Sequence, residues 1–239
     1  ALTFAPLLVL KELPLNDLVV NLLSICEQTL NTPVEIEFAM TFNPHYFGFL
    51  QVRTMVLPED EVHVMDDELT NENVFLASET VFGNGVIENI QDIIYIKPES
   101  FELRNARFVV SELEKFNDTL LASDCPYLLI VFGRLGTTDP WLGIPVKWGQ
   151  ISGANVIVEA TKENIKVELS QGSHFFHNII NLNIKYFSIP FSSPYQIDWE
   201  WLNQQEVVEE ARFVRHVRLQ SPLRVRVDGR SGKGVIYKS

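Results

Sequence analysis

Residues 127–159 constrain the fold of this chain more than any other stretch. They open with an apolar run, residues 128–132, which is too short to span a membrane and has the length of a buried strand. They close with a second such run, residues 155–159, rich in valine and isoleucine. A long connection with repeated glycine and proline joins the runs, and loops of that length inside compact domains are usually functional. The stretch therefore predicts two buried strands and an ordered loop between them.

Helical and strand patterns alternate along the rest of the chain. Apolar residues recur at helical spacing in residues 15–30 and 101–121, and shorter helices are expected at 174–182 and 198–206. Alternating or valine-rich runs separated by turn signals predict strands at 34–40, 47–55, 73–82, 85–96, 128–132, 155–159, 185–190, 211–219, 223–227 and 235–237. A helix that leads into a buried strand indicates parallel pairing, whereas neighbouring strand pairs indicate antiparallel pairing. We expect an α+β fold in which a mixed β-sheet domain with flanking helices is preceded by a helix and a hairpin.

Composition and charge restrict the class of partner. The net charge of −12 argues against nucleic acid and against an anionic membrane surface. Cys26 and Cys125 lie far apart without metal-type spacing and are typical of thiols in a reducing compartment. No apolar run reaches transmembrane length, so we expect no membrane partner and a cytoplasmic location. Because the chain begins with alanine, we expect it to be a fragment from which an upstream segment has been removed.

Polar residues of the two strands near the N-terminus are expected to share one face of a hairpin. Glu37 lies on the polar side of residues 34–40, and Gln51 and Arg53 lie on one side of residues 47–55. A turn signal around Asn43-Pro44 joins the strands, so these side chains are expected to be neighbours. The alternative is an ordinary hairpin with one solvent-exposed face.

The sequence PVEIEFAM…FGFLQVRTM resembles the end of the nucleotide-binding domain of phosphoenolpyruvate synthase and pyruvate phosphate dikinase. That domain has an ATP-grasp-like fold and ends in a hairpin of the type IEWA…LYILQxRP. The resemblance covers residues 15–55, with Phe38 in place of the family's tryptophan and Thr54 in place of its proline. It implies that residues 1–57 are the end of an ATP-grasp-like domain.

The resemblance also implies roles for individual residues and for ligands. Glu37 is similar to the family's carboxylate that holds magnesium and ATP, and Gln51 and Arg53 are similar to polar groups that reach the nucleotide phosphates. A guanidinium stabilises charge on a transferring phosphoryl group, so Arg53 is the implied catalytic residue. The implied cofactors are Mg²⁺ and ATP, with the upstream domain of the same polypeptide as partner and pyruvate or another small molecule as acceptor.

An acidic stretch separates the hairpin from the remainder of the chain. Residues 58–72 contain Pro58 and Asp66-Asp67, and we expect them to be a linker. Residues 73–239 are then a mixed α/β domain of unassigned function. Parts of it, including GRLGTTDPWLGIPVKWGQISGANVIVEA, resemble the C-terminal region of bacterial proteins that carry the same nucleotide-binding domain, but this resemblance implies no site.

The loop after residues 128–132 is a candidate anion site. Gly133, Arg134, Gly136 and Thr137 offer backbone N–H groups, a hydroxyl and a guanidinium, which are the groups that an anion cradle needs. No lysine follows Gly136 as it would in a Walker motif. A buried structural loop is the alternative, and the pattern favours it.

Three further patterns have weaker functional interpretations. His174 and His177 lie on one face of an expected helix and suit a metal, but a packed helix is the favoured interpretation because no further ligand is near in sequence. Residues 229–234 are glycine-rich but lack phosphate-loop spacing, so a hairpin turn is expected. Arg224 and Arg226 either form an anion-binding face or pair with the acidic half of the chain around residues 59–79.

Two classes of function remain after these arguments. The first is a fragment of a phosphoenolpyruvate synthase-like, ATP-dependent phosphotransferase that contributes part of an Mg-ATP site and is inactive in isolation. The second is a non-catalytic module for nucleotide sensing or protein interaction, because we identify no phosphohistidine domain in these residues.

Overall fold

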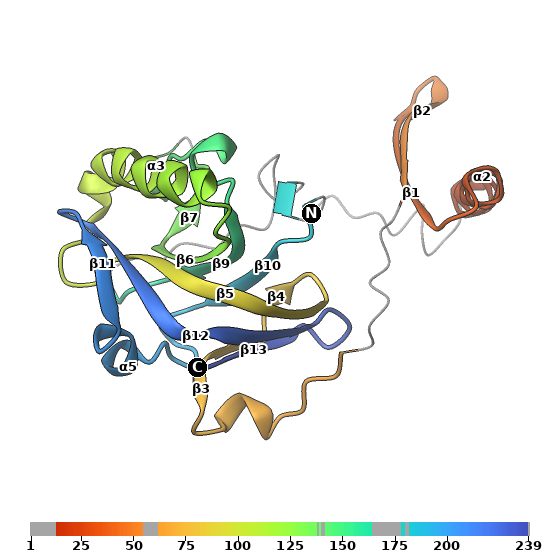
Figure 1. Cartoon of the computed structure of the whole chain (residues 1–239). Coiled ribbons are helices and arrows are strands. Elements are labelled where there is room, and N and C mark those ends of the chain that lie inside the picture. Colours follow the sequence, from red (N-terminus) through yellow and green to blue (C-terminus); the bar gives the residue numbers. More distant parts are fainter. Residues whose placement is uncertain are drawn as a thin grey trace. The chain divides into compact units, whose positions relative to one another are not determined.

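The chain folds as two compact units. The computed structural model describes residues 13–54, 62–137, 139, 142–163, 178–179 and 182–238. Clustering of contacts divides the chain into Ala1–Glu59 and Asp60–Ser239, the N-terminal and C-terminal units (Figure 1). Each unit has its own secondary structure and its own sheet.

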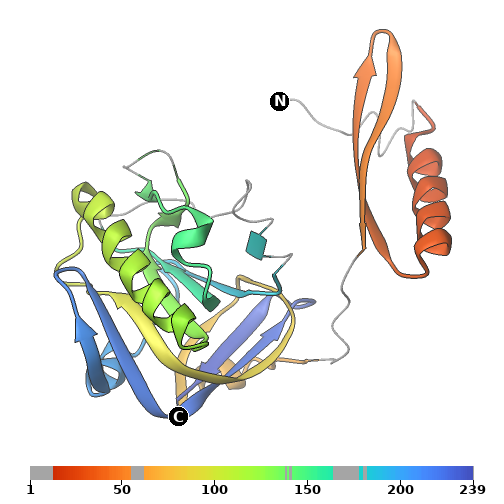
Figure 2. The same ribbon diagram turned by 45° about the horizontal axis from the view of Figure 1, so that its top comes forward.

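The N-terminal unit is a helix beside a two-stranded hairpin (Figure 2). Helix α2, Leu15–Leu30, has the expected apolar spacing and ends at Asn31, whose φ of 53° is the left-handed conformation that asparagine tolerates at a helix end. Strands β1, Val34–Phe42, and β2, His45–Thr54, pair antiparallel through a turn at the cis bond Asn43-Pro44. The helix contacts β1, so the expected helix and hairpin are both present.

The C-terminal unit is built around a mixed sheet. Among the described residues, nine strands follow the order β3-β13-β12-β5-β6-β9-β10-β4, with β11 paired to β12. The middle strands β5, β6, β9 and β10 are parallel, and the strands on both sides of them are antiparallel. The elements are η1 Glu68–Thr70, β3 Val74–Ser78, β4 Val81–Phe82, β5 Gly85–Ile96, η2 Leu103–Asn105, α3 Ala106–Ala122, β6 Tyr127–Phe132, β7 Arg134–Leu135, β8 Gly143–Ile144, η3 Trp148–Gln150, β9 Ala154–Ala160, β10 Lys185–Ile189, α5 Trp199–Asn203, β11 Glu206–Glu210, β12 Val214–Asp228 and β13 Lys233–Tyr237.

The sheet curls so that its two ends meet. Its end strands β3 and β4 are consecutive in the chain and turn at Thr80. The Ser78 hydroxyl donates to the carbonyl of Ser188 on β10 at 2.6 Å, and the Ser188 N–H donates to the carbonyl of Thr80 at 3.0 Å. These hydrogen bonds satisfy backbone groups at an edge that would otherwise be open.

The core lies along the parallel strands. Every residue of β6 is buried, as expected for a parallel strand that is covered on both faces. Helix α3 lies across the sheet in Figure 2 and packs Val109, Leu113 and Phe116 into the same core as β5 and β12. Two predicted boundaries differ here. The helix begins at Ala106 after a short 3-10 turn, and residues 73–82 form two strands that belong to opposite ends of the sheet.

The acidic stretch between hairpin and sheet differs from the expected linker over its described part. From Val62 onward it lies against β3 and β13, and Val62, Val64 and Leu69 are buried in a small cluster with Ala77 and Val235. The three apolar side chains among the acidic residues explain the difference, because their burial attaches the segment to the sheet.

The observed fold class is a mixed α/β arrangement with a large mixed sheet and few helices, consistent with α+β. In the described part of the chain, no helix is both long enough and apolar enough to cross a membrane. The expected helix that contains His174 and His177 falls outside the described residues, apart from residues 178–179 and 182.

Candidate functional site

The polar face of the hairpin brings the predicted nucleotide-site residues together. The strand register pairs Glu37 with Gln51 and Glu35 with Arg53. Directly opposite residues of an antiparallel pair point to the same side of the sheet, so all four side chains share one face. Arg53 Nη2 donates to Gln51 Oε1 at 3.0 Å, and Arg53 Nη1 lies 3.8 Å from Glu35 Oε1.

This face is open enough to take a ligand. The side chains of Arg53 and Glu35 are 34% and 53% exposed, and ion pairs at such exposure contribute little to stability. The guanidinium of Arg53 can therefore exchange Glu35 for a phosphate oxygen at low cost. Glu37 is exposed. A Mg²⁺ ion that is bound mainly by phosphates needs only one or two protein carboxylates, so the donor set fits Mg-ATP but not a metal ion alone.

A β-bulge ends the polar face. The register shifts between Glu37 and Phe38, so that Phe38 pairs with Phe49 and Leu50 is left without an opposite residue. Bulges re-aim side chains next to functional sites as well as at ordinary sheet edges. Beyond the bulge the hairpin carries aromatic residues, and the rings of Phe38 and Phe47 stack at 4.8 Å.

Large apolar side chains are exposed over much of the N-terminal unit. They come from the helix and from both strands: Leu18, Val20, Ile25, Leu30, Phe42, Tyr46, Phe49 and Leu50. Only Leu15 and Val34 are buried among the described residues of this unit. Exposed apolar groups in this number are typical of a surface that packs against a partner.

The loop that was a candidate anion cradle uses its backbone donors within the protein. The N–H groups of Gly133, Arg134 and Gly136 donate to the carbonyls of Ala160, Leu142 and Ile144 at 2.9–3.0 Å. Thr137 Oγ1 donates to the carbonyl of Asp139 and accepts from its N–H. The backbone and hydroxyl donors of the candidate cradle are therefore engaged, and this agrees with the structural loop that the sequence favoured.

The carboxylate of Glu159 occupies the centre of this loop. Its Oε1 accepts the N–H of Leu135 at 2.8 Å and its Oε2 accepts the hydroxyl of Tyr186 at 2.7 Å. Glu159 is fully buried on β9. Strands β7 and β8 of the loop approach so closely that a Cβ on Gly143 would lie 2.1 Å from the carbonyl oxygen of Arg134. The loop thus holds a carboxylate of its own chain.

The second glycine-rich loop is also closed by an internal carboxylate. Residues 229–234 connect β12 to β13 as the expected hairpin turn. Asp228 Oδ1 accepts the N–H groups of Arg230 at 3.0 Å and of Ser231 at 3.2 Å. Lys233 pairs with Asp66 of the acidic segment. Both oxygens of Asp228 have partners, because Oδ2 accepts the N–H of Val64.

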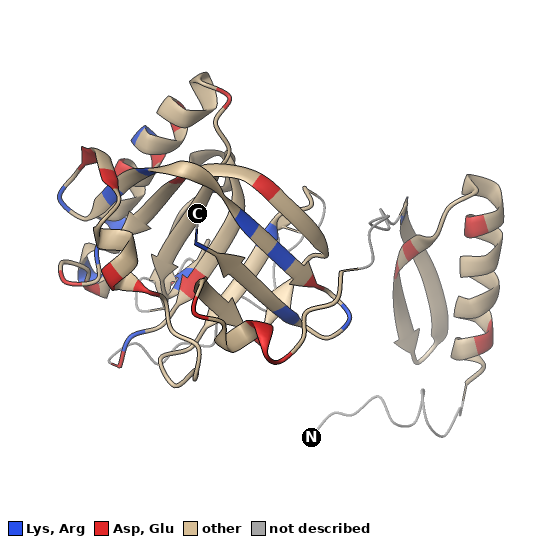
Figure 3. Ribbon diagram, turned by 60° about the horizontal axis from the view of Figure 1, so that its bottom comes forward, with Lys and Arg blue, Asp and Glu red and all other residues tan. Residues whose placement is uncertain are grey.

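The arginines of β12 pair with acidic residues of the same unit. Arg226 pairs with Glu68, and Arg224 Nε lies 3.0 Å from Glu88 Oε1. Figure 3 shows the basic positions of β12 and β13 and the acidic positions of the segment around η1, which the Arg226–Glu68 and Lys233–Asp66 pairs connect. The expected match to the acidic stretch around residues 59–79 forms for Arg226, whereas Arg224 pairs with Glu88 outside that stretch.

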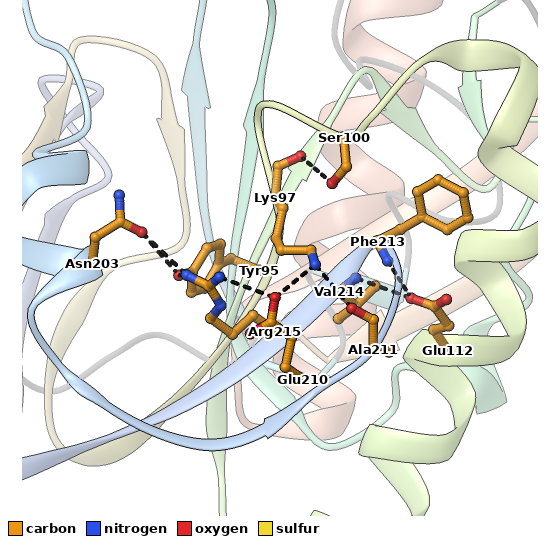
Figure 4. A network of polar contacts seen from close by, with 10 residues as sticks. All are labelled: Tyr95, Lys97, Ser100, Glu112, Asn203, Glu210, Ala211, Phe213, Val214 and Arg215. Carbon is orange, nitrogen blue, oxygen red and sulfur yellow. Dashed lines mark hydrogen bonds and ion pairs between the residues drawn. The ribbon is translucent and has the colours of Figure 1, made fainter.

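A polar network at the carboxyl end of β5 was not predicted. Arg215 donates to Glu210 Oε1 and to the hydroxyl of Tyr95, each at 3.0 Å, and Lys97 Nζ donates to the same oxygen of Glu210 at 2.8 Å (Figure 4). Hydrogen bonds from Lys97 and Arg215 lower the pKa of Glu210 to about 2. Glu112 of α3 accepts the backbone N–H groups of Phe213 and Val214. The network fastens the β11–β12 hairpin to β5 and α3.

A buried charge cluster on β5 and β12 was missed as well. Asp92 accepts two hydrogen bonds from Arg218, at 3.0 and 2.8 Å, and its Oδ1 lies 2.6 Å from His216 Nε2. Burial alone would raise the pKa of Asp92, but the bonds to His216 and Arg218 outweigh burial and lower that pKa. The sequence signal that could have indicated this cluster is Asp92, the one aspartate within residues 85–96.

Comparison with protein-family models, with curated proteins and with solved structures found no match. Within the described residues, no group of three or more His, Cys, Asp or Glu side chains has an arrangement that holds a metal ion. The hairpin face is the site at which the sequence-predicted residues Glu37, Gln51 and Arg53 come together.

Proposed function

We propose that the N-terminal unit is one wall of an Mg-ATP site in a phosphotransferase of the phosphoenolpyruvate synthase and pyruvate phosphate dikinase type. The observation that supports the proposal is the shared face of Glu37, Gln51 and Arg53 on paired strands. Their residue types match those of the family hairpin that they resemble, and they point to one side.

Each residue has a distinct role in the proposed site. Glu37 holds the Mg²⁺ ion that bridges the nucleotide phosphates, as a single carboxylate can when the phosphates supply the other ligands. Arg53 binds phosphate oxygens and stabilises charge on the phosphoryl group in transfer. Gln51 accepts from Arg53 at 3.0 Å and so orients the guanidinium along the face.

The other walls of the site are proposed to come from an upstream domain of the same polypeptide. The exposed apolar side chains of α2 and the hairpin support this part, because a unit that buries so few of its own apolar groups gains stability by packing against a neighbour. ATP and pyruvate, or another small acceptor, are the proposed substrates. In isolation the chain is expected to be inactive.

Calorimetry with Mg-ATP tests the proposal. It is carried out on this chain and on a polypeptide that also carries the preceding part of the nucleotide-binding domain. We expect the longer polypeptide to bind, and Arg53→Ala to weaken its binding by about 1.5–3 kcal/mol, the typical contribution of a hydrogen bond to a charged group. Glu37→Gln, which keeps the shape of the side chain, is expected to weaken binding that depends on Mg²⁺.

Glu35→Gln is the matched control. Glu35 lies on the same face, opposite Arg53, and is an acidic residue of the same size as Glu37. The proposal expects a much smaller effect from it than from Glu37→Gln. Equal effects of the two substitutions would mean that binding depends on the negative charge of the surface and not on Glu37 itself. Absence of binding by the longer polypeptide would refute the proposal.

A non-catalytic module is the second candidate function. It is favoured by the C-terminal unit, where the glycine-rich loops are closed by Glu159 and Asp228 of the chain itself. In this second function the hairpin binds nucleotide as a regulatory ligand, and no phosphoryl group is transferred. Incubating the longer polypeptide with ATP labelled at its terminal phosphates separates the two. Transfer of label to protein or acceptor supports the phosphotransferase, and binding without transfer supports the module.

A further inference from the structure

The face of the hairpin that carries Glu37 continues past the β-bulge to the turn. The extra residue of the bulge lies in β2, so side chains alternate without interruption along β1, and Ala39 and Thr41 project to the same side as Glu37. The register places Gly48 opposite Ala39 and Tyr46 opposite Thr41, and directly opposite residues share a face. One side of the hairpin therefore changes from charged residues far from the turn to an aromatic residue at the turn.

The middle of this face carries almost no side-chain bulk and is open to solvent. Ala39 and Gly48 are both exposed. Apart from its chain neighbours, the nearest atom to a Cβ added to Gly48 would be the Ala39 carbonyl oxygen at 3.8 Å, which is an ordinary contact. Residues 38–50 contain no Asp, Glu, Lys or Arg. An uncharged part of a ligand can therefore lie against the backbone here without displacing a side chain.

Tyr46 provides an open aromatic surface at the end of this face. It is 69% exposed. Among the described residues its ring has no aromatic partner, whereas the rings of Phe38 and Phe47 on the opposite face stack on each other. Exposed aromatic side chains on a sheet are surfaces on which nucleic-acid bases stack, because every base has a π face.

The order of groups along the face matches the order of groups in a nucleotide. Thr41 is four residues from Glu37, and a rise of about 3.4 Å per residue separates them by about 14 Å along β1. An extended nucleoside triphosphate separates its terminal phosphates from its base on this scale, with the ribose between them. Phosphates beside Glu37 and Arg53 thus leave the ribose over Gly48 and the base at Tyr46.

We propose that Tyr46 is the base-stacking residue of the nucleotide site and that the ligand is a purine nucleoside triphosphate lying along the hairpin. This inference rests on the proposed function, because Glu37 and Arg53 must hold the phosphates. Stacking depends on the π face of the base and not on its hydrogen-bonding edge, so ATP and GTP are expected to bind this wall alike. A purine is favoured because its two fused rings give a larger stacking area.

NMR titration of this chain with Mg-ATP and with Mg-tripolyphosphate tests the inference. Tripolyphosphate supplies the phosphates without a base, and the amide shifts of Glu37, Gln51 and Arg53 report the binding of both ligands. We expect Tyr46→Ala to weaken Mg-ATP binding at least about fivefold, the low end of what stacking one base on an aromatic ring contributes, and to leave Mg-tripolyphosphate binding unchanged. Tyr46→Phe keeps the ring and should bind Mg-ATP as the natural chain does.

Phe42→Ala is the matched control. Phe42 is an aromatic residue of similar exposure, 54%, and lies in the next residue pair at the turn on the opposite face, so its removal should leave Mg-ATP binding unchanged. If tripolyphosphate binds but Tyr46→Ala leaves Mg-ATP binding unchanged, or weakens it no more than Phe42→Ala, the stacking role is wrong and the phosphate site stands. Absence of amide shifts with both ligands would overturn the inference together with the phosphate site on which it rests.

Discussion

At the residue scale, carboxylates of the chain itself accept backbone N–H groups in both glycine-rich loops. Glu159 accepts the N–H of Leu135 inside the first glycine-rich loop, and Asp228 accepts two N–H groups of the second. The sequence favoured a structural loop for residues 133–137 and a hairpin turn for residues 229–234, and both loops hydrogen-bond within the chain. The acceptor for the first loop lies on β9, so only the tertiary fold identifies it, and the sequence alone left the ligand open.

Replacing Glu159 with glutamine tests the role of this carboxylate. In glutamine an NH2 group, which donates and does not accept, replaces one of the two oxygens that accept from Leu135 N and the Tyr186 hydroxyl, so one of these hydrogen bonds must be lost or reversed. We expect a loss of about 1–3 kcal/mol in the free energy of unfolding, the usual cost of leaving a buried polar group unsatisfied. Urea denaturation measures it. Tyr186→Phe removes only one donor and should lower the free energy of unfolding by less. If Glu159→Gln leaves the free energy of unfolding unchanged, the carboxylate has no structural role.

Lys185→Met is expected to stabilise the fold. Replacing buried ionic groups with apolar side chains of similar shape is often neutral or stabilising by about 1–4 kcal/mol. The pKa of Lys185 is lowered in the folded state, so the unfolded chain binds more protons, and stability rises with pH up to the ordinary lysine pKa of about 10.4. Urea denaturation from pH 6 to 9 should show a smaller rise for the variant. A less stable variant with an unchanged slope would contradict this account.

At the element scale, hydrophobic periodicity predicted most helices and strands, and their partners were harder to predict. The pattern located α2, β1 and β2 because each has a regular apolar face. Residues 211–227 were divided at Ser221-Pro222, yet β12 is one strand from Val214 to Asp228. Its register with β5 shifts between Arg218 and Leu223, and such an irregularity accommodates a proline that cannot donate. The local sequence does not indicate that the strand continues through Pro222.

The segment that carries η1 is attached to the sheet by Glu68. The carboxylate pairs with Arg226 and accepts from the Tyr237 hydroxyl at 2.7 Å. Burial would raise the pKa of Glu68, but the bonds from Tyr237 and the backbone of Met65, together with the charge of Arg226, lower it. The group therefore stabilises the fold above its unfolded pKa, and this contribution is lost as the pH falls through the folded pKa.

Glu68→Gln should consequently be less stable than the natural chain at pH 7, and the difference should shrink when the pH falls below 4. Urea denaturation at a series of pH values measures both. Glu88→Gln is the control, because Glu88 and its partner Arg224 are more than 60% exposed and such pairs contribute little. If the two variants behave alike at every pH, Glu68 does not anchor the segment.

At the scale of the whole molecule, the sequence predicted a helix and hairpin followed by a mixed sheet, and the structure has both. Among the described residues, the two hydrophobic clusters of the C-terminal unit are formed by side chains from Val62 onward. The curled closure between β3 and β4 was not predictable, because residues 73–82 look like one strand and the hydrogen bonds that divide it come from distant residues such as Ser188.

The hairpin face is the element on which the proposed function rests. Its residues Glu37, Gln51 and Arg53 were identified from the sequence, and the register of β1 and β2 brings them to one side. Their proposed role rests on the resemblance, and the proposed packing partner rests on the exposed apolar side chains of the same unit. Binding of nucleotide to this chain alone is expected to be weak, so the decisive experiment must detect weak binding and locate it.

Paramagnetic broadening of amide NMR signals by Mn²⁺-ATP is that measurement. Mn²⁺ replaces Mg²⁺ on the phosphates and broadens only nearby signals, even when binding is weak. The account predicts broadening at Glu37, Gln51 and Arg53 that requires ATP and is reduced by Glu37→Gln but much less by Glu35→Gln. Broadening confined to the C-terminal unit, or identical with Mn²⁺ alone, would contradict the assignment of the hairpin to a nucleotide site.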